Sequence, residues 1–141
     1  MDKTVITNSA TETIAWAKNF SQVLKPGDVI CLHGDLGAGK TTFVKGLAEG
    51  LGLVKEEHVT SPTFVIMHRY TCRMPLYHFD CYRMQSPEDL LAIGFEDFLH
   101  SGGVACVEWP EKAGTLIPSP CIHITLSHEG EAKRRIKVLK R

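Results

Sequence analysis

The sequence predicts an α/β fold, a single domain over residues 1–141 in which helices flank a mixed, partly parallel sheet. Residues 29–33 and 104–107 are short, continuous apolar runs, which are typical of strands buried on both faces. Helix signals lie between these runs, and such alternation favours parallel pairing. Other strand-like segments occur in neighbouring pairs, which makes the sheet mixed. A length of 141 residues fits one domain.

The N-terminal part of the chain predicts a short strand, residues 4–7, followed by a helix. Ser9 and Glu12 have the spacing of a capping box, which begins a helix. The helix is expected to end before Pro26. Its apolar residues recur at helical spacing: Ile14, Ala17, Phe20 and Leu24.

The rest of the chain contains the paired strands. Residues 64–70 and 75–80 predict one antiparallel pair, and residues 121–126 and 135–139 flank a turn and predict another. A helix is expected to begin at Pro87, because proline suits the first helical position. The apolar face of this helix is predicted from Leu90, Leu91 and Ile93.

The composition indicates a globular protein. Hydrophobic residues make up 43% and charged residues 23%, and no apolar run approaches the roughly 18 residues of a transmembrane helix. Residues 1–4 lack the basic and apolar parts of a signal peptide, so a cytoplasmic location without membrane contact is expected. The formal net charge of zero argues against a dedicated nucleic-acid-binding surface. Residues 133–141 are nevertheless strongly basic. They fit either the solvated face of a last strand or a contact for nucleotide phosphate or an acidic partner.

The cysteines give no sign of a metal centre by their spacing. Their number is odd and no pair forms C-x-x-C, so neither a zinc site nor a disulfide framework is indicated. Buried free thiols are predicted instead, because several lie in apolar runs. The five residues are Cys31, Cys72, Cys81, Cys106 and Cys121.

Residues 34–41, called the phosphate loop below, are the most informative motif. Their sequence, Gly34-Asp35-Leu36-Gly37-Ala38-Gly39-Lys40-Thr41, fits G-x-x-x-x-G-K-S/T between a buried strand and a predicted helix. Glycines let the backbone N–H groups turn toward phosphates, and the start of the helix adds the positive end of its dipole. Lys40 is expected to reach the β- and γ-phosphates, the Thr41 hydroxyl to bind Mg²⁺, and Thr42 to hydrogen-bond the α-phosphate.

Glu108, at the end of the second buried run, is the candidate acidic metal ligand. Four apolar residues that end on an acid resemble the second signature of P-loop ATPases, in which the acid helps to hold Mg²⁺ beside the loop threonine. The pattern alone fits a simple strand end, and the phosphate loop in the same chain favours the metal role. Trp109 follows directly, either as a half-buried packing aromatic or as a wall that excludes water or contacts a partner.

Residues 78–83 form a third polar cluster. On a strand, His78 and Asp80 point to the same face. Two roles fit Asp80: orienting the attacking water, or contacting Mg²⁺ through water. His78 is not expected to bind Mg²⁺, which prefers oxygen ligands, and structural hydrogen bonding is the alternative role for His78 and Arg83.

Residues 60–63 place three hydroxyl groups in a polar, turn-like segment after the phosphate-loop helix. Nucleotide hydrolases often have a switch segment there, ordered by the γ-phosphate and Mg²⁺. The other interpretation is an ordinary loop rich in turn formers. The hydroxyl groups belong to Thr60, Ser61 and Thr63.

Together, these blocks resemble the TsaE family, the small bacterial ATPases of the tRNA threonylcarbamoyladenosine pathway. The similarity rests on residues 34–43, 60–64, 78–83 and 107–110, in the same order and spacing, and it extends over essentially the whole chain. Cys81 is a departure, since the family often has an aliphatic residue there, and it should only alter packing.

The resemblance implies a compact P-loop ATPase that binds ATP and Mg²⁺, with slow and partner-dependent hydrolysis. The residues implied to bind the nucleotide are Thr11, Gly37, Ala38, Gly39, Lys40, Thr41, Thr42 and Arg134. Of these, Thr11 would lie near the adenine, and Arg134 is our choice for a basic residue of the tail that approaches the nucleotide. The implied metal ligands are Thr41 and Glu108, and the implied catalytic residues are Lys40, Asp80 and Glu108. Switch or partner contacts are implied for Thr60, Ser61, Thr63 and Trp109.

The partner implied by the resemblance is the TsaB–TsaD complex, which modifies adenosine 37 of tRNAs that read ANN codons. The chain would meet tRNA only through that complex, and ATP hydrolysis would reset the complex between turnovers.

Three other functions are alternatives to this ATPase. A GTPase usually needs N-K-x-D, but the two asparagines, Asn8 and Asn19, precede the phosphate loop. A small-molecule kinase usually has an arginine-rich lid, which is not seen. A nucleotide-dependent adaptor with negligible hydrolysis alone is the third.

Overall fold

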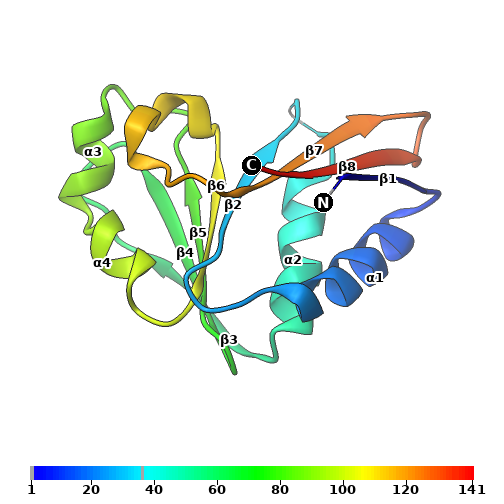
Figure 1. The fold of residues 1–141 in the computed structure, drawn as a ribbon, viewed down its shortest axis with the longest axis horizontal. Helices are drawn as coiled ribbons and strands as arrows, with labels where there is room; N and C mark the ends of the chain where they lie inside the picture. Colours follow the sequence, from blue (N-terminus) through cyan, green and yellow to red (C-terminus); the bar gives the residue numbers. More distant parts are fainter. Residues whose placement is uncertain (1, 36) are drawn as a thin grey trace.

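The computed structural model describes residues 2–35 and 37–141, whose strands join in one sheet (Figure 1). The strands are β1 Asp2–Thr7, β2 Val29–His33, β3 Leu53–Val59, β4 Ile66–Cys72, β5 Leu76–Asp80, β6 Val104–Glu108, β7 Ile122–His128 and β8 Arg134–Lys140. The α-helices are α1 Ala10–Phe20, α2 Lys40–Gly50, α3 Pro87–Ala92 and α4 Phe95–Leu99. Short 3₁₀ helices are η1 Ser21–Val23, η2 Pro110–Lys112 and η3 Gly114–Leu116.

The sheet is mixed, with the strand order β1-β8-β7-β2-β6-β5-β4-β3. Its centre is parallel, because β2 pairs with both β6 and β7, and β5 pairs with β6. Its two flanks are antiparallel, through the pairs β1–β8 and β7–β8 on one side and β3–β4 and β4–β5 on the other. The predicted fold class is therefore confirmed, and so are the two predicted antiparallel pairs.

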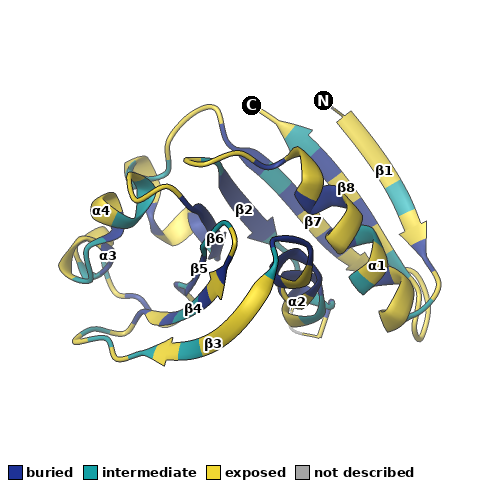
Figure 2. Cartoon of the chain, turned by 90° about the horizontal axis from the view of Figure 1, so that it is seen from below, coloured by how far each residue is buried: buried dark blue, intermediate teal, exposed yellow. Residues whose placement is uncertain are grey.

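Helices cover both faces of the sheet (Figures 1 and 2). Alternate residues of β2 point to opposite faces: Ile30 and Leu32 pack in the core beneath α1 and α2, whereas Val29 and Cys31 pack in the core on the side of α3 and α4. This burial on both faces explains the continuous apolar run that predicted the strand. Phe43 of α2 is fully buried in the first core.

The helices α1 and α2 approach each other closely at a glycine. A Cβ atom on Gly46 would lie 2.6 Å from the carbonyl oxygen of Ile14 and 2.7 Å from the Cβ of Ala17. Only glycine therefore fits at this crossing without moving a helix. The contact holds the helix that follows the phosphate loop against the N-terminal helix.

The sequence-based predictions differ from the structure at several local points. The strand β3 was not predicted, because its centre is charged and most of its residues are exposed at the edge of the sheet. Leu91 was wrongly assigned to the apolar face of α3, since it is 43% exposed while Leu90 is fully buried. The capping box is only half formed: Ser9 accepts from the Glu12 N–H, but the Glu12 carboxylate accepts from the Asn8 N–H, one residue before the cap.

The helices of the described residues include none that is long and apolar enough to cross a membrane.

Candidate functional site

The phosphate loop connects the end of β2 to the start of α2, as its motif requires. Its residue Leu36 lies outside the described residues. Gly39 immediately precedes α2 with φ of 98°, a left-handed conformation that favours glycine. Gly34 needs glycine for another reason, because a Cβ there would lie 2.7 Å from the carbonyl oxygen of Leu126 in β7. The loop is thus pressed against β7 and opens at the N-terminus of an 11-residue helix, where anions are stabilised.

Lys40, the first residue of α2, is buried beside an acid and an aromatic ring. Its side chain is only 7% exposed, and its Nζ lies 3.4 Å from Glu108 Oε1. The same Nζ lies 4.8 Å from the centre of the Trp109 ring, within the range of a cation–π contact. Trp109 has φ of 58°, which is uncommon for a large side chain and costs of the order of 1 kcal/mol. This backbone turn at the end of β6 places the ring beside Lys40.

Glu108 is the centre of a buried chain of charged and polar groups. It ends β6, directly beside β2 and β5, where the pairing register joins Glu108 with Leu32 and with Asp80. Its Oε2 accepts a hydrogen bond of 2.5 Å from His78 Nε2, and its Oε1 faces Lys40. Burial by itself would raise the pKa of Glu108, but the hydrogen bond and charge of His78 and the charge of Lys40 outweigh it and lower the pKa. Glu108 is therefore held as a carboxylate.

His78 lies on β5 and is buried. Its Nε2 contacts Glu108, while its Nδ1 has no hydrogen-bond partner among the described residues. The hydrogen bond to Glu108 agrees with a structural role for His78. It fixes the carboxylate of Glu108 so that the other oxygen faces Lys40.

One cavity brings most of the predicted site residues together. It has a volume of about 380 Å³ and lies where β2, β5 and β6 end, an edge at which ligands of parallel sheets commonly bind. Its lining residues are Gly37, Gly39, Lys40, Thr41, Thr42, Asp80, Glu108 and Arg134. Two carboxylates and two hydroxyl groups therefore converge on one volume beside the phosphate loop.

Asp80 also borders a second cavity, of about 370 Å³, on the Trp109 side. The Oδ1 of Asp80 accepts a hydrogen bond of 3.0 Å from the Tyr82 N–H, which fixes the direction of its carboxylate. Tyr82 in turn packs edge-on against Trp109, with ring centres 4.9 Å apart. The other lining residues are Lys40, Phe64, Ile66, Arg83 and Glu108.

Arg134, the first residue of β8, reaches the phosphate loop from the far end of the chain. Its Nε donates to the Ala38 carbonyl at 3.0 Å and its Nη2 to the Gly37 carbonyl at 3.3 Å. The structure thus brings the predicted basic residue to the loop, whereas the neighbouring Arg135 pairs with Glu129 at 2.6 Å instead.

The start of α1 lies near the phosphate loop, but the side chain of Thr11 does not line the cavity there. A third cavity, of about 190 Å³, lies between the start of α1, the phosphate loop and Arg134, and it is lined by Ala10 and Thr13 on the α1 side. Thr11 is exposed and is not among the residues that line this cavity. Helical geometry explains the difference, because Ala10 and Thr13 are three apart and share a face that Thr11 does not.

The predicted switch segment forms a hydrogen-bonded turn before β4. Ser61 Oγ lies 2.9 Å from Thr63 Oγ1 and accepts from the Thr63 N–H at 3.1 Å. The hydroxyl residues Thr60, Ser61 and Thr63 line none of the cavities described above, so the structure does not bring them to the site. Phe64, the next residue, does line the cavity beside Trp109 and is 53% exposed.

Sequence reasoning missed Thr13, Phe64 and Tyr82 as residues of the site. Thr13 has no motif around it, and its position follows only from the packing of α1. Phe64 was interpreted as part of a strand, and the strand begins two residues later. An exposed aromatic next to a hydroxyl-rich loop is the one signal that could have pointed to Phe64.

Comparisons with known proteins agree on one family. The family model described as "Threonylcarbamoyl adenosine biosynthesis protein TsaE" matches residues 7–136. The protein named tRNA threonylcarbamoyladenosine biosynthesis protein TsaE from Treponema pallidum is 40% identical over 133 residues, which cover 94% of this chain and 97% of that protein. The protein of the same name from Bacillus subtilis is 44% identical over 126 residues, which cover 89% and 77%. A crystal structure of YdiB from Bacillus subtilis matches with a TM-score of 0.79 and 36% identity, covering 98% of this chain and 84% of that one.

Proposed function

Because the chain belongs to the TsaE family, we propose that it is the Mg²⁺-dependent ATPase required for threonylcarbamoyladenosine modification of tRNA at adenosine 37. It acts on the TsaB–TsaD complex and hydrolyses ATP slowly, to reset that complex between turnovers. It meets tRNA through the complex, in the cytoplasm, where tRNA is found. The relatives named above are described as threonylcarbamoyladenosine biosynthesis proteins, which supports the pathway.

The observation that carries the proposal is the convergence of Lys40, Thr41, Asp80 and Glu108 on one cavity of about 380 Å³. A lysine, a hydroxyl group and two carboxylates beside a helix N-terminus are the parts that phosphoryl transfer to water needs. These residues come from three separate segments of the chain. Their convergence therefore supports an ATPase more strongly than the loop motif alone.

The donor groups of the cavity fit Mg²⁺ and nucleotide phosphates. Thr41 offers a hydroxyl oxygen and Glu108 a carboxylate that its surroundings keep ionised, and oxygen donors of this kind are what Mg²⁺ prefers. When bound, Mg²⁺ would neutralise charge on the β- and γ-phosphates. The N-terminus of α2, Lys40 and Arg134 supply positive charge on the protein side.

Lys40 is proposed to exchange partners when nucleotide binds. In this structure its ammonium faces Glu108 Oε1 at 3.4 Å. A phosphate in the loop offers the ammonium more negative charge than one carboxylate does, so Lys40 turns to the phosphate. Glu108 Oε1 would then be available to hold Mg²⁺, directly or through water, while His78 holds Oε2.

Asp80 is proposed to orient the attacking water. Its carboxylate borders the cavity and is held in direction by the Tyr82 N–H. A carboxylate fixed in this way accepts a hydrogen bond from water and directs the water's lone pair toward the γ-phosphate.

The contact surface for TsaB–TsaD is proposed to lie beside Trp109. Three large apolar side chains near it are partly exposed: Phe64 at 53%, Ile66 at 38% and Tyr82 at 47%. They border the cavity that Asp80 and Glu108 also line. Exposed apolar side chains gathered next to a site are typical of a surface that meets a protein partner.

The test is tRNA modification with purified TsaB–TsaD, with and without this chain. The chain should be required when tRNA exceeds the complex but not for a single round, and ATP hydrolysis should accompany the repeated rounds. The Lys40→Ala variant should no longer support repeated rounds of modification. The Lys45→Ala variant should still support them, because Lys45 is an exposed lysine of the same helix. Modification that is independent of the chain would refute the pathway. Dependence without hydrolysis would favour the adaptor, and phosphate transfer to a small molecule would favour the kinase.

A further inference from the structure

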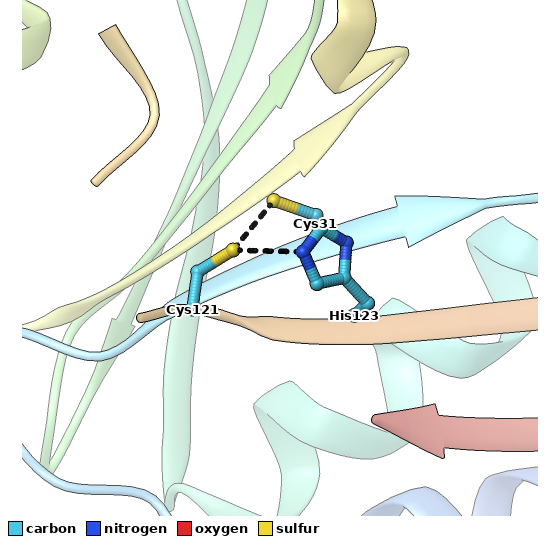
Figure 3. A group of neighbouring side chains, drawn as sticks. All are labelled: Cys31, Cys121 and His123. Atoms are coloured by element: carbon cyan, nitrogen blue, oxygen red, sulfur yellow. Dashed lines mark hydrogen bonds between the residues drawn. The ribbon is translucent and has the colours of Figure 1, made fainter. Parts of the chain in front are cut away.

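A cluster of two cysteines and a histidine lies on the face of the sheet opposite α2 (Figure 3). Cys31 is in β2, Cys121 immediately precedes β7, and His123 is in β7 (Figure 3). Cys31 Sγ lies 3.3 Å from Cys121 Sγ, and Cys121 Sγ lies 3.3 Å from His123 Nε2. One ligand atom from each of the three residues lies within 4.8 Å of the other two. Because β2 and β7 pair in parallel with Cys31 opposite His123, the backbone register itself creates the cluster.

From this geometry we propose that Cys31, Cys121 and His123 bind a zinc-class divalent metal ion. Two thiolates and an imidazole are soft and borderline ligands of the kind that such ions prefer, and Mg²⁺ would not compete. Tetrahedral bonds of the usual zinc lengths would place two sulfurs about 3.8 Å apart, and a sulfur and a nitrogen about 3.5 Å apart. The two separations of 3.3 Å, Cys31–Cys121 and Cys121–His123, are shorter than these by half an ångström or less, and the ligand atoms of Cys31 and His123 lie within 4.8 Å of each other. Small side-chain rotations would therefore admit the ion.

His33 supports the proposed site as a positioning residue. Its Nε2 lies 3.1 Å from His123 Nδ1, and the two rings stack with centres 5.3 Å apart. A hydrogen bond at Nδ1 fixes the orientation of the His123 ring, so that Nε2 faces Cys121. Burial, followed by the charge of Arg141, lowers the pKa of His123, which favours the neutral imidazole that binds metals.

The charges of the site would balance when the metal is bound. The thiolate, not the thiol, is the form of cysteine that binds a metal ion. On binding, one divalent ion replaces two thiol protons, which pass to solvent, and two metal–sulfur bonds form. The ion and the two thiolates together have no net charge, so the buried site contains no unpaired charge.

A cavity of about 380 Å³ gives His123 access to solvent. It is lined by His33, His123, Thr125, Lys137, Leu139 and Arg141. A water molecule would complete the tetrahedron as the fourth ligand without adding charge. With Cys31 in β2, His123 in β7 and Cys121 just before β7, the metal would cross-link the strand that leads into the phosphate loop to its neighbour.

The experiment is titration of the reduced, tag-free chain with Co²⁺, used as a visible substitute for Zn²⁺. One equivalent should produce the absorption of cobalt–thiolate coordination, and Zn²⁺ should displace it with a rise in melting temperature. Cys31→Ala, Cys121→Ala and His123→Ala should each remove or strongly weaken the binding. Cys106→Ala removes an equally buried thiol from the neighbouring strand β6 and should leave it unchanged. His33→Ala should weaken binding about 10- to 100-fold while retaining the thiolate absorption, and His33→Gln should restore part of the affinity.

Two results with the wild-type chain would overturn the proposal and do not depend on the folding of any variant. One is the absence of thiolate absorption under reducing conditions at saturating Co²⁺. The other is cobalt bound without thiolate absorption, which would place the ion at other residues. If the chain instead lost two hydrogen atoms in air and bound no metal when reduced, the pair Cys31 and Cys121 would be a redox pair and not a metal site.

Discussion

Replacing Glu108 with glutamine tests the partner exchange of Lys40 directly. Glu108→Gln keeps the size of the side chain but removes the charge that faces Lys40 Nζ at 3.4 Å. At that distance the attraction is about 5 kcal/mol for an effective dielectric constant of about 20. Desolvation of the two groups offsets most of it, and about 1 to 2 kcal/mol remains, the usual contribution of a hydrogen bond between charged groups.

This remaining energy opposes nucleotide binding, because Lys40 must leave Glu108 to reach a phosphate. Without Mg²⁺, the Glu108→Gln variant should therefore bind ATP about 5- to 30-fold more tightly than the wild type. With Mg²⁺ this gain in affinity should be lost, since the variant lacks the carboxylate that is proposed to bind the metal. The gain in affinity that Mg²⁺ gives the wild type should largely disappear, and partner-dependent hydrolysis should fall by about 100-fold or more.

The assay is titration with a fluorescent ATP analogue, once in excess chelator and once in excess Mg²⁺, with hydrolysis measured separately. Glu96→Gln is the matched control, because it removes an exposed carboxylate of α4 that lines none of the cavities at the site, and it should change neither affinity by much. If Glu108→Gln weakened Mg²⁺-free binding as Lys40→Ala does, Glu108 would be positioning Lys40 for the phosphate and not competing with it. If the Mg²⁺ effect were intact, Glu108 would not be a metal ligand.

Three further predictions follow from the same geometry. Asp80→Asn should reduce hydrolysis by about 100-fold or more while changing the ATP dissociation constant far less, as kinetics and titration of the same sample can show. Gly46→Ala should lower the free energy of unfolding by about 1 to 3 kcal/mol in urea, because the added Cβ meets Ile14, although alanine usually favours a helix. The low pKa of Glu108 stabilises the fold above its ordinary value of 4.5, and this contribution is lost as the pH falls through the folded pKa. The stability difference between wild type and Glu108→Gln should therefore shrink below pH 4.5, and a constant difference would contradict the assignment.

The predictable parts of the fold are those determined by residues that are neighbours in the sequence. The apolar run of β2, the glycines after it and the start of α2 each require only neighbouring residues, and they were predicted at nearly their observed positions. The strand β3 has no such local reason. Its centre is charged and most of its residues are exposed, and it is a strand because β4 offers it an edge with which to pair.

The same distinction applies to the site. The position of Glu108 beside Lys40 could be anticipated, because acids at strand ends meet the loop in P-loop proteins. The hydrogen bond of His78 to Glu108 joins residues 30 apart, and the bond of Arg134 to Ala38 joins residues 96 apart. Such contacts depend on strand order, which the sequence pattern does not specify. The cluster of Cys31 and Cys121 is the extreme case, since a spacing of 90 residues matches no metal-binding motif.

The proposed function and the observed contacts together explain why the acid at the end of β6 is followed by a strained tryptophan. Glu108 serves Lys40 as a counter-ion here and would serve Mg²⁺ as a ligand when nucleotide binds, so its surroundings differ between the two states. The ring of Trp109 lies 4.8 Å from the same ammonium and must lose that contact when Lys40 turns to the phosphate. Trp109 also packs on Tyr82, one of the exposed side chains beside the cavity. Two aromatic rings, those of Trp109 and Tyr82, therefore link the ammonium of Lys40 to the surface where TsaB–TsaD is proposed to dock.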